Sequence, residues 1–207
     1  MKTPIRILIA DDHAVVRTGL AALIDTVADM KVVGEACNGE EAVLEAVRLK
    51  PDVVVMDLMM PKKDGAAATE SLRRLAPRTH VLLLTSFATS DGISRGIEAG
   101  AAGAVLKDSS NDVLIESIRT VASGGRAVSP EIERLIASDP PVKTLTPRQE
   151  EVLQSMTRGL TNRDIARQLL ISEDRVEQHV RSLLAKLGAA NRTEAVAIAF
   201  RKHLLKI

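Results

Sequence analysis

The chain has 207 residues, of which 45% are hydrophobic and 27% charged, a composition typical of a soluble globular protein. Its single cysteine, Cys37, excludes an internal disulfide, and its apolar runs fall short of the roughly 20 residues that cross a bilayer, so we expect a cytoplasmic protein with no membrane partner. Residues 1–125 hold 14 Lys+Arg against 17 Asp+Glu and residues 144–207 hold 11 against 7, a modest basic excess that fits either nucleic-acid binding or a solvated surface.

The first 125 residues alternate short apolar runs with helical patterns. The apolar runs cover residues 7–10, 32–36, 53–56, 81–84 and 104–106. Amphipathic helical spacing follows each run, over residues 15–24, 42–47, 72–75, 93–97 and 113–121. Short continuous apolar runs indicate strands that are buried on both faces. The alternation therefore predicts an α/β domain over residues 1–125, with a doubly wound, five-stranded parallel sheet.

The remainder of the chain contains no strand-like run and is predicted to be helical. Gly124-Gly125 ends the last amphipathic pattern, and residues 126–143 are expected to form a linker with a short helix over 130–137. Residues 144–207 fit a small all-α domain of four helices. Its second and third helices, from Asn162 to Leu169 and from Arg175 to Leu187, are joined by a short turn, which is typical of a helix-turn-helix. On periodicity alone, an ordinary helical bundle is the preferred interpretation.

Polar side chains follow four of the predicted strands. They are Asp11, Asp12, Asp57, Thr85 and Lys107. The carboxyl ends of parallel strands meet at one edge of the sheet, so these side chains are expected to converge there. A cluster of carboxylates without His or Cys suits a hard cation such as Mg²⁺, and an Asp carboxylate beside it can act as a nucleophile towards phosphorus. Each residue alone has a simpler reading, since an Asp after a strand is often only a helix cap.

With these residues in view, residues 5–124 resemble the receiver domain of bacterial two-component response regulators, a flavodoxin-like fold. The matching features are the acidic pair, the segment Asp57-Leu58-Met59-Met60-Pro61-x-x-x-Gly65, Thr85 and Lys107. The resemblance implies that Asp57 accepts a phosphoryl group from a sensor histidine kinase. It implies that Asp12, Asp57 and the Met59 carbonyl bind Mg²⁺ directly and Asp11 through water. Thr85 would contact the phosphoryl group and switch its loop, and Lys107 would pair with the phosphate.

The fifth strand departs from the receiver pattern. Such domains usually carry an aromatic switch residue two or three positions before the lysine, whereas this chain has Ala104 there. Phe87 is not an evident substitute. Acceptance of phosphate does not depend on this residue, but the coupled movement of Thr85 and an aromatic side chain is not expected here.

Residues 144–205 are similar to the LuxR-type DNA-binding domain. The similarity rests on Leu145-Thr146-Pro147-Arg148, on the segment Gly159-Leu160-Thr161-Asn162-Arg163-Asp164-Ile165-Ala166, and on the spacing from Val176 to Gly188. It implies that the third helix of the domain enters the major groove of double-stranded DNA. The residues expected on its outward face are Arg175, Glu177, Gln178, Arg181 and Ser182.

Glu177 departs from the LuxR-type pattern, in which Lys is common at that position. Its carboxylate either reads a cytosine amino group or pairs with Arg181 one helical turn later. Together, the two halves resemble the NarL/LuxR class of response regulators. This predicts a transcription factor whose dimerisation and DNA binding are controlled by Mg²⁺-dependent phosphorylation of Asp57. The alternative is a phosphorylation-controlled interaction module with weak or no DNA binding.

A turnover enzyme is not expected. Phosphohydrolases that use an aspartyl phosphate usually carry a second Asp two residues after the nucleophile. Met59 stands at that position here and offers no acid–base group.

Overall fold

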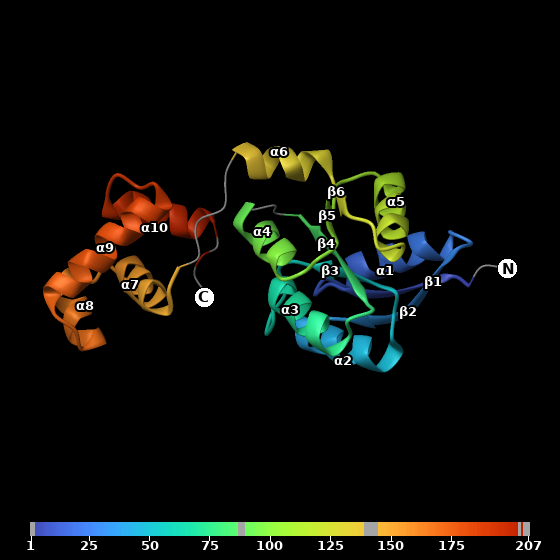
Figure 1. Cartoon of the computed structure of the whole chain (residues 1–207), viewed down its shortest axis with the longest axis horizontal. Coiled ribbons are helices and arrows are strands. Elements are labelled where there is room, and N and C mark those ends of the chain that lie inside the picture. The colour runs from blue at the N-terminus through green and yellow to red at the C-terminus, as the bar shows by residue number, and fades with distance from the viewer. Residues whose placement is uncertain (1–2, 87–89, 139–144, 203, 205–207) are drawn as a thin grey trace. The chain divides into compact units, whose positions relative to one another are not determined.

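The computed structural model describes residues 3–86, 90–138, 145–202 and 204 (Figure 1). The chain divides into two compact units, residues 1–140 and residues 141–207. No helix in the described part of the chain is long and apolar enough to span a membrane.

The first unit is an α/β sandwich built on one parallel sheet. The strands are β1 (Ile5–Ala10), β2 (Met30–Ala36), β3 (Val53–Asp57), β4 (His80–Thr85), β5 (Gly103–Leu106) and β6 (Ala127–Val128). Their order is β2-β1-β3-β4-β5-β6, and every neighbouring pair is parallel. The predicted doubly wound parallel fold is confirmed, but the predicted number of five strands is wrong because β6 adds a sixth at the edge.

Helices cover both faces of this sheet. They are α1 (Ala14–Asp25), α2 (Gly39–Leu49), α3 (Gly65–Leu75), α4 (Ser90–Glu98), α5 (Asn111–Ala122) and α6 (Pro130–Ser138). One apolar core joins α2, α3, α4 and α6 to one face, and a second core joins α1 and α5 to the other. Alternate residues of each strand enter opposite cores: Val54 and Met56 face the first, while Val53 and Val55 face the second. Burial of both faces explains the continuous apolar runs in the sequence.

The segment after α5 belongs to the first unit, which corrects the expectation that residues 126–143 form a linker. β6 pairs with Gly103 and Ala104 of β5. A side chain at Gly103 is excluded there, because a Cβ would lie 2.1 Å from the carbonyl oxygen of Ala127. The following helix α6 buries Ile132 completely in the core that contains α4. The predicted short helix therefore exists, but it is packed onto the sheet.

The second unit consists of helices around a separate apolar core. Its described helices are α7 (Pro147–Thr157), α8 (Asn162–Leu169), α9 (Glu173–Leu187) and α10 (Arg192–Arg201), as the sequence predicted. Side chains cap their N-termini: Thr146 and Thr161 form capping boxes, and Ser172 and Asn191 each accept a backbone N–H. The turn between α8 and α9 contains Leu170 in the left-handed conformation, at φ 55°. It fixes how α9 leaves α8.

Candidate functional site

Three of the predicted polar residues meet at the carboxyl edge of the sheet. Asp11 follows β1, Asp57 ends β3 and Lys107 follows β5. The Nζ atom of Lys107 lies 2.5 Å from Oδ2 of Asp11 and 3.0 Å from Oδ2 of Asp57. Both carboxylates are almost fully buried, whereas Asp12 is partly exposed beside them. The partly buried ammonium of Lys107 therefore bridges two carboxylates from different strands.

The loop after β3 is folded tightly against Asp57. The Met59 N–H donates to Oδ1 of Asp57 at 3.3 Å, and the Gly65 N–H donates to the Leu58 carbonyl. A Cβ at Gly65 would lie 2.3 Å from the Asp57 carbonyl oxygen, so only glycine permits this close return of the chain. The loop thereby fixes one oxygen of the carboxylate.

The electrostatics of the pocket raise the pKa of Asp57. Burial raises the pKa of its carboxyl above the ordinary value, and the neighbouring Asp11 adds to this. The hydrogen bond and charge of Lys107 oppose the shift without cancelling it. For Lys107, burial acts to lower the pKa of the ammonium, but its contacts with Asp11 and Asp57 outweigh burial and raise that pKa. The pocket therefore contains more negative charge than one ammonium neutralises.

The residues present fit a divalent cation. One ligand atom each from Asp11, Asp12, His13 and Asp57 lies within 4.8 Å of the others. Oδ2 of Asp11 is buried and contacts the Lys107 ammonium at 2.5 Å. That single ammonium serves two buried carboxylates, so a divalent cation would neutralise the negative charge that Lys107 leaves unbalanced. The predominance of carboxylate oxygens suits a hard ion such as Mg²⁺.

Thr85 lies at the end of β4 and is buried. Its carbonyl accepts a hydrogen bond from the Lys107 N–H at 2.9 Å, so the predicted switch residue and the predicted phosphate-binding lysine are joined through the backbone. Ala104 occupies the position at which receiver domains usually have an aromatic switch residue. It is fully buried in β5, between Leu83 of β4 and Val128 of β6. Phe87 lies outside the described residues.

Two residues around the acidic pair were not singled out from the sequence. The His13 ring contacts both carboxylates through Nδ1, at 2.8 Å from Asp12 and 3.3 Å from Asp11. Arg17 donates to the Asp11 carbonyl at 2.7 Å and also to Glu35 of β2. The position of His13 directly after the acidic pair could have indicated from the sequence that its ring lies beside these carboxylates. Arg17 could not be identified in this way, because its contacts depend on how α1 packs against β2.

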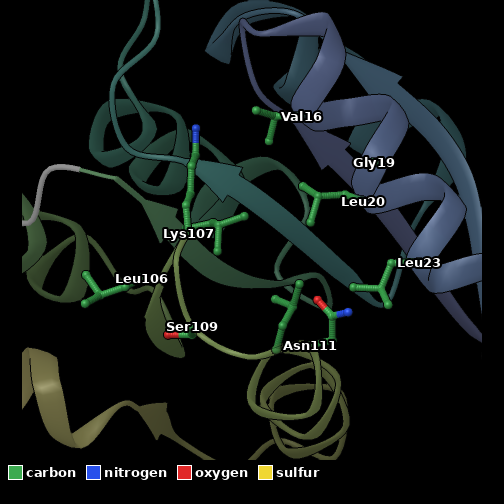
Figure 2. A pocket seen from close by; sticks show the side chains of 10 residues that line it. Val16, Gly19, Leu20, Leu23, Leu106, Lys107, Ser109 and Asn111 are labelled. Atoms are coloured by element: carbon green, nitrogen blue, oxygen red, sulfur yellow. The ribbon is translucent and has the colours of Figure 1, made fainter.

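A pocket of about 270 Å³ opens between α1 and α5, beside the acidic site (Figure 2). Lys107 runs along one side of it, and Val16, Leu20 and Leu23 of α1 line the other. Immediately before Val16, the side chain of Val15 is 86% exposed. An open, mostly apolar surface therefore adjoins the Asp57 pocket.

In the second unit, α9 presents a polar face. Its inward residues Val176 and Leu183 are fully buried. The exposed side chains include four of the five predicted there, namely Arg175, Glu177, Gln178 and Arg181. Nη2 of Arg181 lies 2.5 Å from Oε1 of Glu177, so the pairing considered for these residues is present.

Ser182 differs from the other four, because its side chain is turned towards α7. Its hydroxyl accepts a hydrogen bond from Nε2 of Gln149 at 2.9 Å. Oε1 of the same, nearly buried Gln149 accepts from Lys186 at 2.8 Å and from the Thr146 N–H at 3.0 Å. Gln149, which the sequence did not reveal, therefore ties α9 to the N-terminus of α7 and fixes which side of α9 faces outward.

Comparison with known proteins matches each unit to a family. Residues 7–119 match the response regulator receiver domain, and residues 143–199 match the bacterial regulatory proteins of the luxR family. The transcriptional regulatory protein LiaR of Bacillus subtilis is 37% identical, over 97% of this chain and 99% of its own length. The response regulator protein VraR of Staphylococcus aureus is 34% identical, over 98% and 99%.

Solved structures agree with these matches. The response regulator ChrA of a heme-sensing two-component system is 36% identical, with a TM-score of 0.61 over 99% of this chain and all of its own. The RcsB–DNA complex is similar in fold, with a TM-score of 0.68 over 96% of this chain and 99% of its own at 24% identity. The chain thus belongs to the response regulators that join a receiver domain to a LuxR-type DNA-binding domain, and it is a transcriptional regulator of that class.

Proposed function

We propose that Asp57 is the phosphoacceptor of this response regulator and that its modification controls DNA binding by the second unit. The observation that carries the proposal is the position of the Asp57 carboxylate. It lies at the end of the central strand β3, 3.0 Å from the Lys107 ammonium and among further carboxylates. The donor is a sensor histidine kinase or a small acyl phosphate, and the setting is the cytoplasm. The chain accepts a phosphoryl group and is not a turnover enzyme.

The reaction transfers one phosphoryl group. An oxygen of Asp57 forms a bond to phosphorus while the bond from phosphorus to the donor's histidine nitrogen breaks, and the imidazole leaves. The Met59 N–H holds Oδ1 of Asp57, which leaves Oδ2 on the side of Lys107. The ammonium offsets negative charge on the transferring group. Thr85 ends the neighbouring strand β4, and we assign its hydroxyl as a donor to the phosphoryl oxygens.

Mg²⁺ supports this chemistry by neutralising charge on the phosphoryl oxygens while it is bound. We assign Asp12, Asp57 and the Met59 carbonyl as its direct protein ligands, and Asp11 as a ligand through water. The support is the surplus of carboxylate charge around the single Lys107 ammonium. The ion would relieve the desolvation that raises the pKa of Asp57 and keep the nucleophile ionised.

The apolar surface between α1 and α5 is our candidate for the kinase contact. A phosphohistidine must approach Asp57 closely, so the kinase must bind a surface that borders the acidic site. The pocket in Figure 2 shares Lys107 with that site, and the exposed Val15 lies on the same helix as its lining. Exposed apolar side chains beside a pocket are typical of protein contacts.

The output is sequence-specific binding of double-stranded DNA by α9. Arg175, Glu177, Gln178 and Arg181 are our candidates for contacts in the major groove. Ser182 is the weakest of the five predicted contacts, because its hydroxyl is engaged with Gln149. We further propose that phosphorylation promotes a homodimer, in which two copies of α9 bind paired half-sites.

Binding of the purified chain to sheared genomic DNA tests this function. The protein is incubated with Mg²⁺, with and without beryllofluoride as a phosphoryl mimic, and the retained fragments are sequenced. Discrete sites gained with the mimic in the wild type, but not in Asp57→Ala, are expected. Undiminished phosphate incorporation by Asp57→Ala would refute the acceptor assignment. A lack of enriched sites in every condition would favour the interaction module.

A further inference from the structure

The orientation of α9 decides which of its side chains can reach DNA. The buried Gln149 holds Ser182 and Lys186 on the side of α9 that faces α7. Val176, Leu183 and Leu187 fill the core beneath the helix. The opposite flank carries Glu177 and Arg181, whose side chains are 51% and 74% exposed.

Glu177 and Arg181 form a directed pair on that flank. They are four residues apart, with the acid towards the helix N-terminus, which is the favourable orientation for such a pair. Exposed pairs contribute little to stability, so a role in folding does not account for this one. A carboxylate close to the phosphate backbone is also repelled by it, and Glu173 and Asp174 on the preceding turn are exposed acids as well.

The pair is complementary to the major-groove edge of one kind of base pair. A G·C pair presents two acceptors on guanine, N7 and O6, followed by the N4 donor of cytosine. The Arg181 guanidinium offers two parallel donors, and the Glu177 carboxylate beside it offers an acceptor. Adenine also presents an amino donor, but its N7 acceptor lies next to that donor and repels a carboxylate.

We propose that Glu177 and Arg181 read a G·C base pair as a unit, with Arg181 on guanine and Glu177 on the cytosine amino group. This inference rests on the proposed DNA binding, and it specifies one base pair that the DNA site must contain. Glu177 is then a specificity-determining residue. It weakens non-specific binding through its charge and favours cytosine at one position.

Selection from a randomised duplex library tests the proposal. The full chain is used with Mg²⁺ and beryllofluoride, as wild type, Glu177→Gln and Arg181→Ala. Glu173→Gln is the matched control, because it removes the same charge from the exposed surface of the same helix without touching Arg181. Dissociation constants are then measured for duplexes that differ at the selected base pair.

The wild type and the control should discriminate G·C from A·T at one position of the half-site, by about 5- to 150-fold. Glu177→Gln should lose much of that discrimination and accept adenine, whereas Arg181→Ala should lose it entirely. If Glu177→Gln instead tightens binding to every sequence alike and leaves the preference unchanged, the carboxylate only repels phosphate and the proposal is wrong. Selection of no sequence by any protein would overturn the DNA-binding function itself.

Discussion

Replacement of Asp57 by Asn should stabilise the first unit at neutral pH when no divalent cation is present. Asn has nearly the shape of the protonated carboxyl, and the raised pKa of Asp57 means that the native state tolerates the neutral form better than the charged form. Each pK unit by which the native value exceeds the unfolded one costs about 1.4 kcal/mol of stability at neutral pH. We therefore expect the free energy of unfolding to rise, by an amount set by how far the native pKa of Asp57 exceeds that of the unfolded chain.

The sign of the pH dependence is fixed by the same shift. The native state binds the proton of Asp57 more tightly than the unfolded chain does. The wild type therefore loses stability as the pH rises from the ordinary carboxyl value of 3.8 through the raised native pKa. Asn has no such proton. The advantage of the variant should be smallest below this window and complete above it.

Urea unfolding in EDTA measures the effect. The chain has no Trp or Tyr, so circular dichroism replaces intrinsic fluorescence, and amide exchange at the buried Val54 and Val55 assigns the transition to the first unit. Asp108→Asn makes the same chemical change at an exposed position and should have little effect. Added Mg²⁺ should stabilise the wild type more than Asp57→Asn, because the variant lacks a ligand. A variant that is no more stable than the wild type at neutral pH would refute the reasoning.

Three further substitutions test other parts of the structure. Ile132→Ala should destabilise the first unit by about 2–5 kcal/mol, because it leaves a cavity under α6; unchanged urea unfolding would show that α6 is not part of the core. Gln149→Leu removes a hydrogen-bond partner of both Ser182 and Lys186, so it should destabilise the second unit by about 1–3 kcal/mol. It should also weaken binding to all DNA sequences equally. A change in the preference for one base of the site would contradict a positioning role for Gln149. Val15→Asp should slow phosphotransfer from a histidine kinase about tenfold or more while leaving transfer from an acyl phosphate unchanged, and an equal loss with both donors would exclude a kinase contact at this surface.

The fold was largely predictable from the sequence because burial on both faces leaves a strong pattern. Val53 to Met56 is a continuous apolar run, and each of its residues enters one of the two cores. β6 left no such pattern, because it has two residues and is defined by its pairing with Gly103 and Ala104. α6 did leave a pattern that our interpretation did not use: Ile132, Leu135 and Ile136 have the i, i+3, i+4 spacing of an amphipathic helix, and all three pack against the first core.

The candidate site was predictable to the extent that strand ends determine it. Asp11, Asp57 and Lys107 meet because parallel strands place their carboxyl ends together. Gln149 and Ser182 are 33 residues apart, and their contact depends on how α7 and α9 are rotated against each other. No periodic pattern encodes that rotation. The hydrogen bond between Ser182 and Gln149 was therefore not foreseen from the sequence.

The packing of α6 against the sheet changes the length of the tether between the two units. A linker over residues 126–143 would reach about 65 Å when fully extended, whereas the stretch from Ser138 to Leu145, which is buried in the second core, reaches about 25 Å. A tether less than half as long confines the DNA-binding unit to a much smaller volume around its receiver, which raises the effective concentration of each unit at the other. Insertion of flexible residues after Ser138 would lengthen this tether step by step. The effect of receiver phosphorylation on DNA binding should become weaker with each increase in length.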